Sequence, residues 1–292
     1  MAPGFDDVKT VEVDGTSLAY RDKGEGENVV FVHGSLSDLR SWEPQVEALG
    51  RTHRAMAYSR RYSPPNEPIP AGVDDQMNPH VDDLTRFLTA TGAAPAHLVG
   101  NSWGAFIALF AAIRSPDLVK SLTLGEPPAI TLFTSMPPKP SEMLGLLVRR
   151  PRTAIAIGGF GVRVIAPAEK AFRKDDDEAG MLAFVHGVLG KAAYEEMPEE
   201  RRRQAEQNLA PLKASMLGAG YPPVSETQLR SLKAPTLLLE GENTRAFFRR
   251  VLDRLEQLIP VTERRVLPNT THTQEENPAA MSEMVLDWIS RD

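Results

Sequence analysis

Residues 96–114 read AHLVGNSWGAFIALFAAIR, and this stretch decides the fold. Leu98-Val99 indicates a short buried strand that runs into Gly100. Residues 103–114 are apolar on nearly every face, which predicts a deeply buried helix that ends before Pro116. Between the two lies Gly100-Asn101-Ser102-Trp103-Gly104, a G-x-S-x-G pentapeptide.

Ser102 is therefore expected on a sharp turn from strand to helix. Such a turn strains the backbone, and only small residues two positions before and two after the serine avoid a clash. Gly100 and Gly104 meet that demand. The amino end of the following helix carries partial positive charge, which favours an oxyanion formed beside it. This context makes Ser102 the candidate nucleophile.

The same alternation of strand and helix continues on both sides of the motif. Helical stripes such as Val81, Leu84, Phe87 and Leu88 separate the strand candidates. This pattern predicts an α/β protein with a mostly parallel sheet and helices on both faces. The first two strands are expected to form an antiparallel edge. The strand candidates are 8–13, 17–20, 28–32, 54–58, 98–99, 122–124, 235–239 and 264–267.

Residues 127–232 interrupt this alternation and contain no convincing strand. Eleven of the 24 prolines fall there, between short helical segments. We expect a core of residues 1–126 and 233–292, with 127–232 forming a helical cap inserted after the sixth strand. Apolar cap residues are expected to line a hydrophobic pocket, including Met143, Leu146, Leu147, Phe160, Phe172, Leu182 and Phe184.

Composition narrows the function classes. The 292 residues carry a net charge of −6, which does not favour a nucleic-acid partner. The chain has no cysteine, so disulfides and thiol nucleophiles are excluded. Its longest apolar run is residues 105–113, far short of the roughly twenty needed to span a membrane. No signal peptide, metal cluster or phosphate-binding loop is evident. We expect a soluble cytoplasmic protein with no membrane partner and no cofactor.

A serine nucleophile needs a base, and His272 is the candidate among six histidines. It lies in the loop after the last strand, at the edge of the sheet where Ser102 is also expected. His33-Gly34-Ser35 ends an earlier strand. The backbone N–H groups of Ser35 and Trp103 are the candidate oxyanion donors, and His33 is expected to be structural.

The order of strand–His-Gly, G-x-S-x-G and a late loop histidine resembles the α/β-hydrolase superfamily over essentially the whole chain. The resemblance implies the α/β-hydrolase fold, an eight-stranded sheet and a triad in the order serine, acid, histidine. The usual acid position after the seventh strand holds Thr244, which cannot serve. Some members place the acid after the sixth strand, where Glu126 stands 24 residues beyond Ser102. The resemblance therefore implies Glu126 as the acid, with Glu242 as the alternative.

A serine nucleophile with a glutamate after the sixth strand is similar to the zearalenone lactonases. The haloalkane dehalogenases share the acid position but use an aspartate nucleophile. The resemblance implies a serine hydrolase that cleaves an ester or lactone of a mostly apolar small molecule. Two alternatives stay open: a C–C bond hydrolase of the meta-cleavage type and a low-turnover small-molecule sensor. The oligomeric state also stays open. Arg60 and Arg61, after the fourth strand, are expected either to tie that loop to a neighbouring carboxylate, which is the structural role we favour, or to contact a polar substrate.

Overall fold

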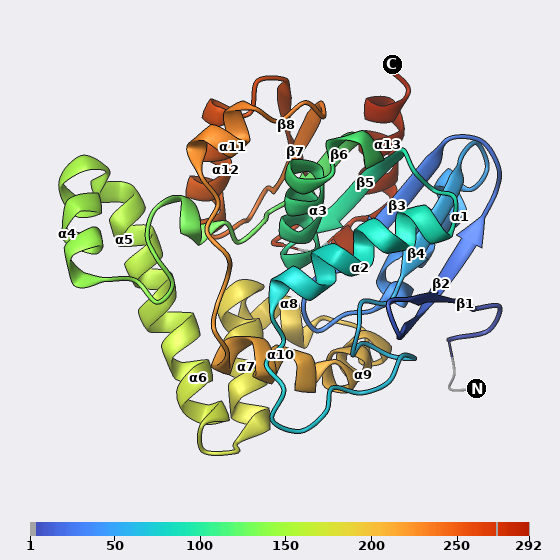
Figure 1. Cartoon of the computed structure of the whole chain (residues 1–292). Coiled ribbons are helices and arrows are strands. Elements are labelled where there is room, and N and C mark those ends of the chain that lie inside the picture. The colour runs from blue at the N-terminus through green and yellow to red at the C-terminus, as the bar shows by residue number, and fades with distance from the viewer. Residues whose placement is uncertain (1–3, 273, 292) are drawn as a thin grey trace.

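The computed structural model describes residues 4–272 and 274–291 and contains one eight-stranded sheet (Figure 1). The strand order is β1-β2-β4-β3-β5-β6-β7-β8. Only β2 runs antiparallel to its neighbours. The predicted fold class is confirmed, antiparallel edge included. The strands are β1 (Lys9–Val13), β2 (Thr16–Lys23), β3 (Asn28–Val32), β4 (Arg54–Tyr58), β5 (Ala96–Asn101), β6 (Val119–Gly125), β7 (Thr236–Gly241) and β8 (Thr262–Leu267).

Alternate residues of the central strands point to opposite faces of the sheet, and each face has its own helices. Val30 and Val32 belong to the core that contains α2 (Met77–Ala90), α3 (Trp103–Arg114) and α12 (Ala246–Leu258). Val29 and Phe31 belong to the core that contains η1 (Leu39–Trp42), α1 (Glu43–Leu49) and α13 (Pro278–Ile289). Burial on both faces explains why these strands are continuous apolar runs. Two short 3₁₀ helices, η2 (Pro116–Leu118) and η5 (Gln274–Glu276), complete the core.

The connection from β6 to β7 contains only helices and loops among the described residues, and we call residues 127–232 the cap. Prolines occupy the first turns of α4, α5 and α6, where a missing N–H leaves no helical bond unmade. Three of the eleven cap prolines, Pro140, Pro151 and Pro167, therefore mark helix starts. The cap helices are η3 (Ile130–Leu132), α4 (Pro140–Arg149), α5 (Pro151–Phe160), the π-helix η4 (Gly161–Ile165), α6 (Ala166–Phe172), α7 (Asp177–Val188), α8 (Lys191–Glu195), α9 (Glu199–Gln207), α10 (Leu209–Leu217) and α11 (Glu226–Arg230).

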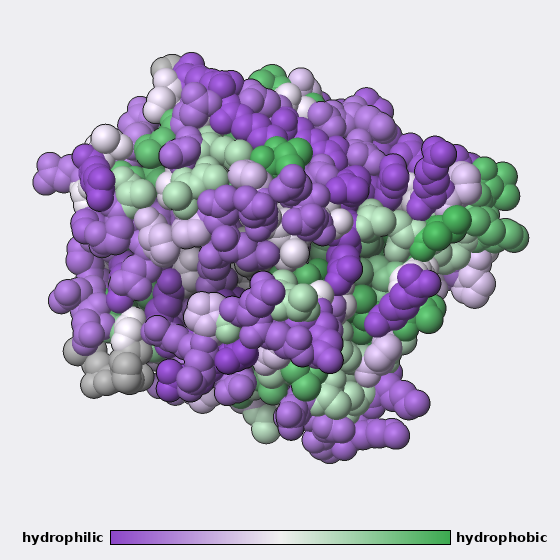
Figure 2. All heavy atoms as spheres, turned by 180° about the vertical axis from the view of Figure 1, so that it is seen from behind, coloured by the Kyte–Doolittle hydropathy of each residue, from purple (hydrophilic) through white to green (hydrophobic). Residues whose placement is uncertain are grey.

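One end of the cap projects from the body of the molecule. Helices α4 and α5 form this end, at the left of Figure 1. Figure 2 shows hydrophobic atoms gathered on the same edge, seen from behind. Leu144, Val148, Ile155 and Val162 are each more than 60 % exposed there. In the part of the chain that the structure describes, no helix has the length and apolar character to cross a membrane.

Candidate active site

Ser102 lies at the junction of β5 and α3, in a backbone conformation that side chains rarely adopt. Its φ is 52° and its ψ is −121°, which typically costs about 1–3 kcal/mol. The flanking glycines permit this turn. A Cβ on Gly100 would meet the backbone of Ala105 at 2.6 Å, and one on Gly104 would meet a backbone carbonyl of β3 at 2.1 Å. The G-x-S-x-G spacing is therefore a packing requirement of this turn.

His272 is held by a buried carboxylate from a different loop. Its Nδ1 lies 2.5 Å from Oε2 of Glu126, and both side chains are at most 5 % exposed. Glu126 directly follows β6, and its other oxygen accepts the backbone N–H of Gly241 at 2.8 Å. The Asn101 side chain donates to the carbonyl of His272 at 2.9 Å. The last residue of β5 and the loops that follow β6 and β8 are thus joined at one edge of the sheet.

The alternative acid, Glu242, has a different partner. Its side chain is exposed and accepts the backbone N–H of Asn269 at 2.9 Å. Of the two candidate acids, the structure therefore places Glu126 on the imidazole and Glu242 in a solvent-exposed loop contact.

Ser102 and His272 line one cavity that is partly open to solvent. Ser35 and Asn101 also face it from the core. Its cap side is largely apolar and is lined by Phe184, Val185, Val188, Leu189, Tyr194 and Met197. The expected lining was mostly wrong, because Phe184 alone of the seven predicted residues reaches the cavity. Leu147 is exposed, and Phe172 is buried against other cap helices.

A polar pair interrupts the apolar cavity wall. Arg201 of α9 lies 2.7 Å from the carboxylate of Glu275, three residues after His272. Burial raises the pKa of Glu275, and the neighbouring guanidinium opposes that rise. This pair joins the cap to the loop that carries His272.

The turn after β3 approaches the serine closely. A Cβ on Gly34 would lie 3.2 Å from both the Cβ of Ser102 and the carbonyl of Asn101. Ser35 follows on the cavity wall, and Trp103 is the first residue of α3. The two predicted oxyanion donors thus flank the serine from two different elements.

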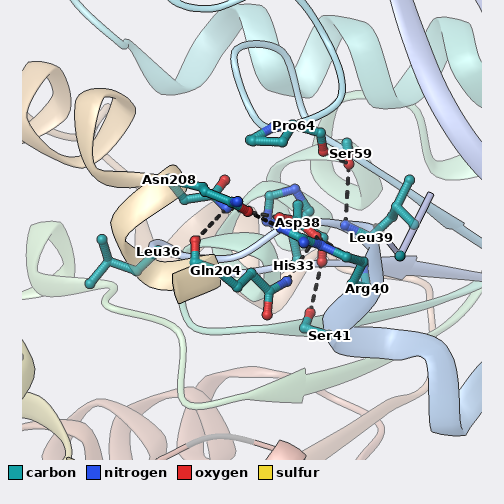
Figure 3. A network of polar contacts seen from close by, with 12 residues as sticks. His33, Leu36, Asp38, Leu39, Arg40, Ser41, Ser59, Pro64, Gln204 and Asn208 are labelled. Carbon is teal, nitrogen blue, oxygen red and sulfur yellow. Dashed lines mark hydrogen bonds and ion pairs between the residues drawn. The ribbon is translucent and has the colours of Figure 1, made fainter. Parts of the chain in front are cut away.

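Asp38 ties this turn to the cap (Figure 3). Its carboxylate is fully buried and accepts from the side chains of Gln204 and Asn208, both at 2.8 Å. Arg40 donates to the same carboxylate at 2.7–3.1 Å through its backbone and guanidinium. Arg201 also donates to the carbonyl of Leu36 at 2.8 Å. Arg201 and Gln204 of α9, together with its C-cap residue Asn208, therefore fix the loop that carries Ser35.

Sequence reasoning missed the Asp38 cluster, because its members lie 166 and 170 residues apart and share no motif. It did predict that Arg61 is structural. Arg61 forms two bonds of 2.6 Å to the buried carboxylate of Asp83. No group of three metal-binding side chains lies together within residues 4–272 and 274–291.

A sequence profile described as the alpha/beta hydrolase family matches residues 29–284. The chain belongs to the alpha/beta hydrolase family. It is 34 % identical over 117 residues to the dihydrolipoyllysine-residue acetyltransferase component of the acetoin cleaving system from Cupriavidus necator, covering 40 % of this chain and 31 % of that protein. It is 26 % identical over 117 residues to the (E)-2-((N-methylformamido)methylene)succinate hydrolase of Acinetobacter baylyi, covering 40 % of this chain and 44 % of that protein. The matches thus span less than half the length of these curated relatives.

Solved alpha/beta hydrolase structures are similar over nearly the whole chain. An esterase from Thermogutta terrifontis, solved with malate bound, has a TM-score of 0.73 at 21 % identity and 97 % coverage of both chains. The enol-lactonase from Burkholderia xenovorans has a TM-score of 0.70 at 20 % identity, covering 97 % of this chain and all of that one. At these identities the likeness shows the fold.

Proposed function

We propose that this family member is a serine hydrolase that cleaves a carboxylic ester or lactone through an acyl-enzyme on Ser102. One observation carries the proposal: the strained Ser102 shares its cavity with His272, whose Nδ1 is bound to the buried carboxylate of Glu126. A serine, a histidine and a buried carboxylate in this relation form a nucleophile, a base and the group that orients the base.

The chemistry proceeds in two stages. His272 accepts the proton of the Ser102 hydroxyl as the oxygen attacks the substrate carbonyl, and Glu126 stabilises the imidazolium that forms. The N–H groups of Ser35 and Trp103 donate to the oxyanion, a contribution of about 3 kcal/mol per donor. The imidazolium then gives its proton to the leaving oxygen. Water activated by His272 releases the acyl group and restores the hydroxyl. Apart from the substrate and this water, every group in the proposed steps belongs to this chain.

The substrate we propose is a mostly apolar small molecule, because the cap side of the cavity is aliphatic and aromatic. The Arg201–Glu275 pair supplies one polar contact point in that wall. An esterase and an enol-lactonase among the similar structures support this class. The acid after the sixth strand, as in the zearalenone lactonases, makes a macrolactone the first lactone to test.

A panel of p-nitrophenyl esters and lactones of graded size tests the proposal. We expect steady multiple turnover by the wild type and at least a thousandfold lower kcat in Ser102→Ala. Full activity of Ser102→Ala would refute the proposed function. A single-turnover burst would favour a sensor. Turnover of a diketone or vinylogous acid added to the panel, with no turnover of the esters and lactones, would favour C–C bond hydrolysis.

A further inference from the structure

Arg60 is a buried cation at the end of β4. Its side chain is 2 % exposed, and its bonds go to backbone oxygens. Nε donates to the carbonyl of His33 at 3.1 Å, and Nη2 donates to the carbonyl of Gly34 at 3.0 Å. Both acceptors belong to the turn that carries Ser35. Arg60 is therefore bound to the turn beside the proposed oxyanion site.

Arg60 and the neighbouring Arg61 differ in whether a carboxylate pairs with them. Arg61 forms a two-bond ion pair with Asp83, whereas no described carboxylate lies within ion-pair distance of Arg60. The buried acid that attracts it, Asp75, is hydrogen-bonded to His80 at 2.7 Å. A buried charge without a bonded counter-ion destabilises a fold. Such a departure from ordinary packing is expected where function requires it.

The carbonyl oxygen of Gly34 is contacted by two side chains, those of Arg60 and His33. The backbone N–H of Arg60 donates to Nε2 of His33 at 2.9 Å, which leaves the ring proton on Nδ1. That nitrogen lies 2.9 Å from the Gly34 carbonyl oxygen, so it donates to the same atom as Arg60. Two donors, one of them charged, therefore fix the direction of this carbonyl.

The Gly34 carbonyl and the Ser35 N–H belong to one planar trans peptide unit. Fixing the carbonyl therefore fixes the N–H, which points the opposite way. A cation on the carbonyl also polarises the unit and strengthens its N–H as a donor. The same guanidinium lies 4.4 Å above the ring of Trp103, the residue of the second proposed donor. Arg60 thus contacts the carbonyl of the peptide unit that carries the Ser35 N–H, and the ring of Trp103, whose N–H is the second proposed donor.

We propose that Arg60 is the positioning residue of the oxyanion site, orienting the Ser35 peptide through its carbonyl and bracing Trp103 through its ring. The inference rests on the proposed function, because it requires an oxyanion formed at Ser102. It assigns to Arg60 an effect on the transition state and little effect on binding of the ground state.

The test compares Arg60→Met with Arg61→Met, since the two arginines are adjacent and only one contacts the Ser35 turn. The readouts are kcat and KM on a p-nitrophenyl ester and the inhibition constant of an alkyl boronic acid, which mimics the tetrahedral intermediate. We expect Arg60→Met to lower kcat by about ten- to a hundredfold, less than removal of a donor itself, with KM changed less than about threefold. Boronate affinity should fall by a similar factor. Arg60→Lys should recover part of both losses, because it keeps the charge.

Arg61→Met is expected to lower the urea midpoint while keeping kcat and boronate affinity within about threefold of wild type. A loss of kcat in Arg60→Met without a loss of boronate affinity would overturn the proposal, as would unchanged kcat. If Arg60→Met, Arg60→Lys and Arg60→Gln all fail to fold while Arg61→Met folds, Arg60 serves the fold alone and the proposal is wrong. Failure of the proposed function is distinguishable, because it would appear as undiminished turnover in Ser102→Ala.

Discussion

Replacement of Glu126 by glutamine keeps the size of the side chain and removes its charge. In the wild type, the Glu126 carboxylate accepts from two donors at once, the Gly241 N–H at 2.8 Å and His272 Nδ1 at 2.5 Å. An amide has one oxygen, so its NH₂ group must face one of those two nitrogens. If the oxygen stays on Gly241, the NH₂ group faces Nδ1 and drives the ring proton to Nε2, where it blocks proton transfer from Ser102.

The size of the expected loss in kcat has two causes. The wrong tautomer of His272 cannot accept the serine proton, and the imidazolium that forms in the reaction loses the negative charge beside it. We expect kcat to fall by about 10³- to 10⁴-fold, which corresponds to about 4–5.5 kcal/mol in the activation barrier. KM should change little, because neither contact of Glu126 involves the substrate. The assay is steady-state hydrolysis of the best p-nitrophenyl ester at pH 7, with circular dichroism to check folding.

Glu242→Gln is the matched control. Its carboxylate is exposed and bound to the Asn269 N–H, so we expect kcat within about threefold of wild type. The reasoning fails if Glu242→Gln is crippled while Glu126→Gln retains turnover, because the acid would then lie after the seventh strand.

Three further predictions concern stability. Asp38→Asn removes a buried carboxylate that accepts four side-chain hydrogen bonds and one backbone hydrogen bond. We expect this change to lower the free energy of unfolding, measured in urea, by about 3–5 kcal/mol. A loss under about 1 kcal/mol would contradict this expectation. Gly104→Ala places a Cβ 2.1 Å from a backbone carbonyl of β3 and should abolish soluble expression, whereas Gly145→Ala, with open space around it, should fold normally. Burial lowers the pKa of His33 and of His80, so the unfolded chain binds more protons below pH 6.5. The free energy of unfolding should therefore decrease as the pH is lowered below about 6.5, by up to about 1.4 kcal/mol per pH unit for each histidine. A free energy of unfolding that stays constant between about pH 7 and pH 5 would refute the lowered pKa of these histidines.

Much of the fold was predictable because its strands are short, buried and separated by turns or amphipathic helices. The run from Asn28 to Val32 is apolar on both faces, as a central parallel strand requires. Ser102 was predictable for a steric reason, since its turn admits no Cβ two residues away on either side. Glu126 could be proposed from its place after the sixth strand, but the residues alone did not choose between it and Glu242.

Contacts between distant polar side chains were not predictable. Asp38 contacts Gln204 across 166 residues, and neither residue lies in a pattern that points to the other. The prediction of which cap residues line the cavity failed for a related reason. Apolar residues of a short helix pack either against other helices or against the cavity, and only the helix orientation decides, as Phe172 and Phe184 show.

Covalent trapping of Ser102 tests the central claim most directly. A p-nitrophenyl alkylphosphonate should phosphonylate the protein with 1:1 stoichiometry and release one equivalent of p-nitrophenolate. Mass spectrometry of the digest should place the added mass on the peptide that contains Ser102, and Ser102→Ala should remain unlabelled. Stoichiometric labelling at another residue, or an unlabelled wild type that still hydrolyses esters, would contradict the account.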